Sequence, residues 1–120
     1  MDDKLLKSFE IANFMTTLAN QKKVFYEEYQ QNCIYFFDGA TFKVTRELIN
    51  FVKTLIDLGH TDAVLLDDNN LPVDIPALAT FLDSILSVYA SATNAYQTQY
   101  QKIKNSRSVE SLLDLWHRVY

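Results

Sequence analysis

The sequence has few of the residues that interrupt regular structure. Its 120 residues include only two glycines and two prolines, and these residue types most often end a helix or a strand. A single cysteine, Cys33, excludes an internal disulfide, and with only two histidines beside it the chain is too poor in ligands for the usual zinc sites. These shortages predict long regular elements around a hydrophobic core, with no cofactor, metal or disulfide.

Two further absences narrow the functional classes. The net charge of −4 lacks the excess of Lys and Arg that drives nucleic-acid binding. No apolar run approaches the roughly 18 residues needed to cross a bilayer, and residues 1–4 lack the basic leader of a secretion signal. We therefore expect no nucleic-acid partner, no membrane partner and a cytoplasmic protein.

What the sequence does contain is a segment that occurs twice. Residues 34–56 hold two short apolar runs followed by apolar residues at helical spacing, and residues 63–86 repeat this order. The helical halves align without a gap, and the aligned pairs are Leu48 with Leu78, Phe51 with Phe81, Val52 with Leu82, and Leu55 with Ile85. A unit of about 30 residues is long enough for one supersecondary motif that cannot bury its apolar face alone. The repeat predicts two β-hairpin–helix modules packed on one another.

The whole pattern predicts a single α+β domain over residues 1–120. A long N-terminal helix is expected from about Asp3 to Asn32, where neither glycine nor proline interrupts an apolar seam. The two modules follow, and we expect their strands to form one antiparallel four-stranded sheet. A long third helix should begin near Pro76, either antiparallel to the first helix or paired with another subunit. Ser108 is expected to cap a short C-terminal helix.

Local signals mark the ends of the elements in the first module. Asp38-Gly39 between two apolar runs predicts a tight hairpin, because glycine accepts the positive φ of a primed turn. Thr45 is a candidate N-cap for the helix that follows. Gly59 is a candidate C-terminal stop for that helix, in the left-handed conformation.

The second module contains an acidic stretch, residues 67–70, with the sequence Asp-Asp-Asn-Asn. A calcium loop is one interpretation, but the stretch lacks the alternating ligands, the central glycine and the closing glutamate of that motif. A hairpin turn explains it better, since Asp and Asn side chains satisfy turn backbone groups locally. Pro72 then places the returning strand at a sheet edge, because proline lacks a backbone donor.

The sequence shows no catalytic constellation. His60 follows the predicted end of a helix and His117 lies in the predicted C-terminal helix, and neither has a nucleophile at a recognisable spacing. Gly39 and Gly59 lie too far apart to form a phosphate-binding loop. We therefore predict that the protein is not an enzyme.

The aromatic and leucine side chains of the outer helices are the candidate partner-binding residues, because such side chains are enriched at interface hot spots. The candidates are Tyr89, Tyr96, Tyr100, Leu112, Leu115 and Trp116. For Trp116 the sequence leaves two positions open, in an interface or folded back onto the sheet as core. The heptad-like seams of the long helices predict a homo-oligomer.

A resemblance to a known group of proteins extends over most of the sequence, and it rests on residues 12–21, residues 37–39 with 42–45, and residues 65–73. They resemble small proteins encoded by T-even-like contractile-tailed phages of marine cyanobacteria. The resemblance implies a virion component or an assembly factor inside an infected bacterium, and it supplies no active-site residues.

Two functional hypotheses follow. The preferred one is a non-enzymatic virion-structural or assembly protein that acts through oligomerisation or docking to a larger partner, in the host cytoplasm or in the virion. The alternative is a small adaptor protein that binds and modulates a host enzyme.

Overall fold

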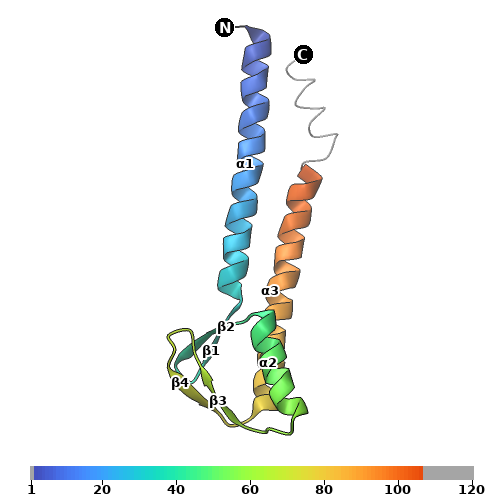
Figure 1. Ribbon diagram of the computed structural model, residues 1–120. Helices are drawn as coiled ribbons and strands as arrows, with labels where there is room; N and C mark the ends of the chain where they lie inside the picture. Colours follow the sequence, from blue (N-terminus) through green and yellow to red (C-terminus); the bar gives the residue numbers. More distant parts are fainter. Residues whose placement is uncertain (1, 107–120) are drawn as a thin grey trace. The chain divides into compact units, whose positions relative to one another are not determined.

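The computed structural model describes residues 2–106, which form three helices and two β-hairpins (Figure 1). The mixed helix and strand content confirms the α+β prediction. The expected C-terminal helix that begins near Ser108 lies outside the described residues. In chain order the elements are α1 (Asp3–Asn32), β1 (Ile34–Phe37), β2 (Ala40–Lys43), α2 (Arg46–Asp57), β3 (Ala63–Leu66), β4 (Pro72–Ile75) and α3 (Leu78–Ser106).

The described residues divide into two compact units. The first unit contains residues 2–28 and 95–106, which belong to α1 and to the end of α3. The second unit is Tyr29–Asn94 and contains both hairpins, α2 and the beginning of α3.

The first unit is an antiparallel pair of helical segments. The ring of Tyr26 on α1 lies 6.0 Å from the ring of Tyr96 on α3. The Lys22 Nζ lies 5.4 Å from the centre of the Tyr100 ring. The residue that is earlier on α1 thus contacts the residue that is later on α3, so the two segments run antiparallel. Of the two predicted alternatives, packing against the first helix or pairing with another subunit, the structure shows the first.

The first hairpin has the turn that its sequence predicts. Asp38 and Gly39 both have positive φ, 49° and 78°, as a primed turn requires. The register places Phe37 opposite Ala40 and Ile34 opposite Lys43.

The helix α2 has the predicted signals at both ends. The Leu48 N–H donates to the Thr45 Oγ1 at 3.1 Å, which confirms the N-cap. Gly59 has a φ of 92° and donates its N–H to the Ile56 carbonyl at 2.9 Å, while the next residue donates to the Leu55 carbonyl at 3.0 Å. This pair of bonds is the Schellman arrangement that satisfies the last carbonyls of a helix.

Residues 67–70 form the hairpin turn between β3 and β4, as predicted. The buried Asp67 Oδ1 accepts hydrogen bonds from the N–H groups of Asn69 and Leu71, each at 2.9 Å. Asn70 adopts a φ of 61°, which Asn tolerates better than most residues. The Asp67 carboxylate therefore serves the turn backbone.

The prediction of a single four-stranded sheet is wrong, because the strands form two separate two-stranded antiparallel sheets. The Val44 N–H donates to the Cys33 carbonyl at 2.6 Å, so Cys33 and Val44 are a hydrogen-bonded pair. Because hydrogen-bonded and non-bonded pairs alternate along an antiparallel ladder, Lys43 and Thr41 belong to non-bonded pairs. The backbone groups of Thr41 and Lys43 therefore point away from β1. Asp68 meets both: its N–H donates to the Thr41 carbonyl and its Oδ1 accepts from the Lys43 N–H, each at 2.9 Å. One residue of the second hairpin thus occupies the place of a third strand.

The outer edge of β4 cannot supply a full ladder either. The Asp67 N–H donates to the Leu71 carbonyl at 2.9 Å, so Leu66 and Pro72, the next pair in the register, are a non-bonded pair. The proline nitrogen faces away from β3, toward the outer edge, and it has no hydrogen to donate. This confirms the prediction that the Pro72 strand lies at an edge.

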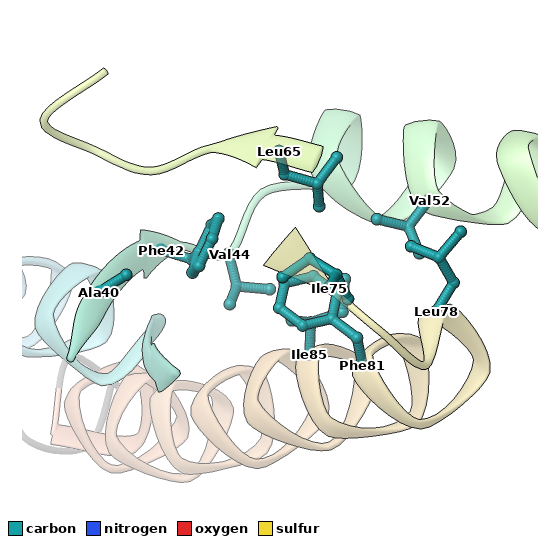
Figure 2. Packing of buried hydrophobic residues seen from close by; sticks show 9 residues of the cluster. All are labelled: Ala40, Phe42, Val44, Val52, Leu65, Ile75, Leu78, Phe81 and Ile85. Atoms are coloured by element: carbon teal, nitrogen blue, oxygen red, sulfur yellow. The ribbon is translucent and has the colours of Figure 1, made fainter. Parts of the chain in front are cut away.

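A cluster of buried apolar residues forms the core of the second unit (Figure 2). Phe81 on α3 lies at 5.7 Å from the Tyr35 ring, 5.7 Å from the Phe37 ring and 5.3 Å from the Phe42 ring, each in an edge-to-face arrangement. These contacts join α3 to the first hairpin. The cluster contains Ala40, Phe42, Val44, Val52, Leu65, Ile75, Leu78, Phe81 and Ile85.

The two repeat segments share their order of elements but differ in burial. Each forms a hairpin followed by a helix. Phe81 is 2% exposed, whereas its aligned partner Phe51 is 54% exposed. On α2 the fully buried residue is the neighbouring Val52, and adjacent helical residues point about 100° apart. The aligned phenylalanines therefore serve different purposes.

We expect Phe81→Ala to lower the free energy of unfolding by about 3–5 kcal/mol, because it empties a site between three rings. Phe51→Ala, the matched control on α2, should cost less than about 1 kcal/mol, since its ring is largely in water. Urea unfolding of both variants measures the difference. Equal losses would contradict the different positions of the two rings.

We expect Asp68→Ala to lower the free energy of unfolding by about 1 kcal/mol, the usual net contribution of one hydrogen bond. The more specific effect is on the Lys43 amide, which loses its acceptor and should exchange its hydrogen with solvent faster. Amide exchange measured by NMR tests this. Asp68→Asn keeps an acceptor oxygen and should protect the Lys43 amide more than Asp68→Ala does; equal protection in both variants would contradict the assigned bond.

Candidate interaction surfaces

Each two-stranded sheet has an inner face on the core and an outer face in solvent. In the first sheet the inner residues Tyr35, Phe37 and Phe42 contact Phe81, and the alternate residues point outward. We define outer face 1 as Ile34, Phe36, Thr41 and Lys43, and outer face 2 as Val64, Leu66, Pro72 and Asp74.

The outer faces expose large apolar side chains. Phe36 on outer face 1 is 74% exposed, and Val64 and Leu66 on outer face 2 are each 61% exposed. Neighbouring apolar residues that stay in water mark candidate interaction sites more strongly than scattered ones do.

Sequence reasoning missed these surfaces because the first strand of each hairpin is apolar throughout. Residues 34–37 and 63–66 read as strands that are buried on both faces. The second strand of each hairpin indicates which face is exposed: Thr41 and Lys43 alternate with buried residues, and Pro72 and Asp74 alternate with the half-buried Val73 and the buried Ile75. The residues opposite these in a hairpin must share the exposed face.

The predicted partner-binding tyrosines fall in both units. Tyr89 is half-buried against the core of the second unit. Tyr96 and Tyr100 lie together in the first unit with their rings 6.3 Å apart. In that unit the Gln99 Nε2 also donates to the Glu28 Oε2 at 3.0 Å. The remaining predicted residues, Leu112, Leu115 and Trp116, lie outside the described residues.

A polar cluster at the end of α1 combines Tyr29, the buried Cys33 and Thr93 within the second unit. Burial raises the pKa of the Tyr29 hydroxyl from 10.0 to about 12; a hydrogen bond with the Cys33 side chain adds to the rise, and one with Thr93 opposes it. The hydroxyl therefore stays protonated at neutral pH. The Cys33 N–H donates to the Tyr29 carbonyl at 3.1 Å and its own carbonyl accepts from Val44, so Cys33 links α1 to the first hairpin.

A cavity of about 420 Å³ lies between the end of α2 and the start of α3. Its lining is mostly apolar, and His60 is the titratable residue in it. Ligand sites usually combine an apolar wall with several converging polar groups, which this lining does not provide. The lining residues are Ile56, Gly59, His60, Thr61, Pro76, Ala77, Leu78 and Ala79.

Within residues 2–106, no three His, Cys, Asp or Glu side chains lie close enough together to hold a metal ion. In the same part of the chain, every helix is too short or too polar to cross a membrane. No protein-family model, curated protein or solved structure matches the chain.

We expect the wild-type protein to lose stability as the pH rises from about 10 to 12. The folded state holds the Tyr29 proton up to a pKa of about 12, whereas the unfolded chain releases it near 10, so deprotonation favours unfolding in this window. Tyr29→Phe has no proton to lose there. Urea unfolding at several pH values should show a smaller decline for this variant, and parallel curves would contradict the pKa assignment.

Proposed function

We propose that the protein is a non-enzymatic structural or assembly protein that acts by associating with other protein molecules, and with copies of itself in particular. The observation that carries this proposal is the exposure of Phe36, Val64 and Leu66 on the outer faces of the two sheets. Burying one such side chain contributes about 1.5–3 kcal/mol. An association that covers all three would therefore be favoured by several kcal/mol before its entropic cost.

The resemblance to proteins of contractile-tailed phages of marine cyanobacteria supports a more specific proposal. In that setting the chain is a virion component or an assembly factor, and it acts in the cytoplasm of an infected bacterium or in the virion. Self-association fits such a component, because phage particles are assembled from many copies of the same chains.

The alternative proposal is a small adaptor that binds and modulates a host enzyme. It is supported by the exposed rings of Tyr26 and Tyr100 on the first unit, since tyrosine is common at interface hot spots. An adaptor can bind its partner as a monomer, whereas the preferred proposal includes association of the chain with itself.

We expect the average mass of the purified protein to rise with its concentration, because each molecule carries apolar faces that a second molecule can cover. Sedimentation velocity across a concentration series measures this. A single monomeric species at every concentration would contradict self-association and favour the adaptor.

A further inference from the structure

The two outer faces carry opposite charges on similar apolar surfaces. Lys43 is the charged residue of outer face 1, and Asp74 is the charged residue of outer face 2. Both side chains are exposed. Within residues 2–106 neither has an ion-pair partner.

The arrangement of residues on the two faces is also similar. The first strand of each hairpin supplies the apolar side chains, and the second strand supplies the charge. In the register, Lys43 lies opposite Ile34, and Asp74 lies opposite Val64. Each face is thus an apolar strip beside one charge, with the sign reversed between the faces.

We propose that outer face 1 of one chain packs against outer face 2 of a second copy, in a head-to-tail interface. This inference rests on the self-association proposed above and specifies the surfaces that carry it. Packing unlike faces covers the apolar side chains of both and brings a Lys43 toward an Asp74. Packing like faces would bring two lysines or two aspartates together, and like charges across an interface oppose binding.

A second copy is the occupant because every chain carries both halves of the complementary pair. The two outer faces of one chain do not pack against each other, since Phe36 and Leu66 are largely exposed within the same unit. Any other partner would need a surface complementary to one face only, and it would leave the opposite face in water.

The same geometry predicts a closed ring or a chain of copies. A head-to-tail dimer leaves one outer face of each member uncovered, and closure of a heterologous contact into a ring removes both free ends. Each face comprises four residues, so a single contact is small beside the roughly 800 Å² per partner of a standard interface. A ring covers both faces of every chain.

The experiment compares charge variants by sedimentation velocity at matched concentrations. Lys43→Glu and Asp74→Lys should each weaken association at least about tenfold, because each places like charges across the interface. An equal mixture of the two variants should recover association, since each then meets an opposite charge on the other. The double variant should recover it as well.

Matched controls separate the interface from general effects of charge. Lys23→Glu on α1 and Asp83→Lys on α3 change the net charge by the same amounts at exposed positions, and both should associate like the wild type. Phe36→Ser tests the apolar part without changing the charge and should reduce association, whereas Phe51→Ser on α2 should not. Because the Phe36 ring is mostly in water within one chain, its removal should leave the unfolding midpoint unchanged at concentrations where the wild type is monomeric.

The outcomes separate the inference from the proposed function. A wild-type oligomer that is insensitive to Lys43→Glu, Asp74→Lys and Phe36→Ser overturns the inference and leaves self-association standing. A mixture of the charge variants that fails to recover overturns the head-to-tail pairing, as does stronger association of Lys43→Glu alone. A wild-type protein that is monomeric throughout contradicts the proposed self-association itself.

Discussion

The contact of Phe81 with three aromatic rings is the interaction on which the second unit depends. Phe81 lies near the beginning of α3, and its partners Tyr35, Phe37 and Phe42 come from both strands of the first hairpin. Edge-to-face aromatic pairs contribute beyond the area they bury, and here one ring serves three of them. The same cluster includes Val52 from α2 and Leu65 from β3. Phe81 therefore holds α3 in the core that α2 and the second hairpin also share.

The link through Asp68 determines how the two hairpins meet once that core has formed. Its N–H and its carboxylate bond to the outward-facing backbone of β2, so the hairpins are joined without merging into one sheet. A third strand at this edge would need the Thr41 carbonyl and the Lys43 N–H, and Asp68 already bonds both groups. Asp68 therefore ends the first sheet at two strands on its β2 side.

Local features were predictable from the sequence, and long-range ones were not. The Asp38-Gly39 turn, the Thr45 cap and the Gly59 stop were confirmed, because each depends on the conformational preference of one or two residues. The prediction of a single sheet was wrong, because the hydrogen bond that the Lys43 N–H donates to the Asp68 carboxylate joins positions 25 residues apart and no local pattern encodes it. The exposure of Phe36 was also missed, since four apolar residues in a row indicate a strand without telling which face is buried.

The blocked edges bear directly on how copies of this chain can associate. Asp68 covers the edge of β2, and Pro72 removes a donor from the edge of β4, which are two of the ways that proteins limit edge-to-edge pairing. The remaining edges belong to β1 and β3, which are four residues long, and short strands offer few backbone groups to a neighbour. The large exposed apolar side chains of the four strands, Phe36, Val64 and Leu66, therefore lie on the outer faces and not at a free backbone edge. In the interface proposed above, Phe36, Lys43 and Asp74 select the partner, whereas backbone pairing at an edge accepts almost any strand.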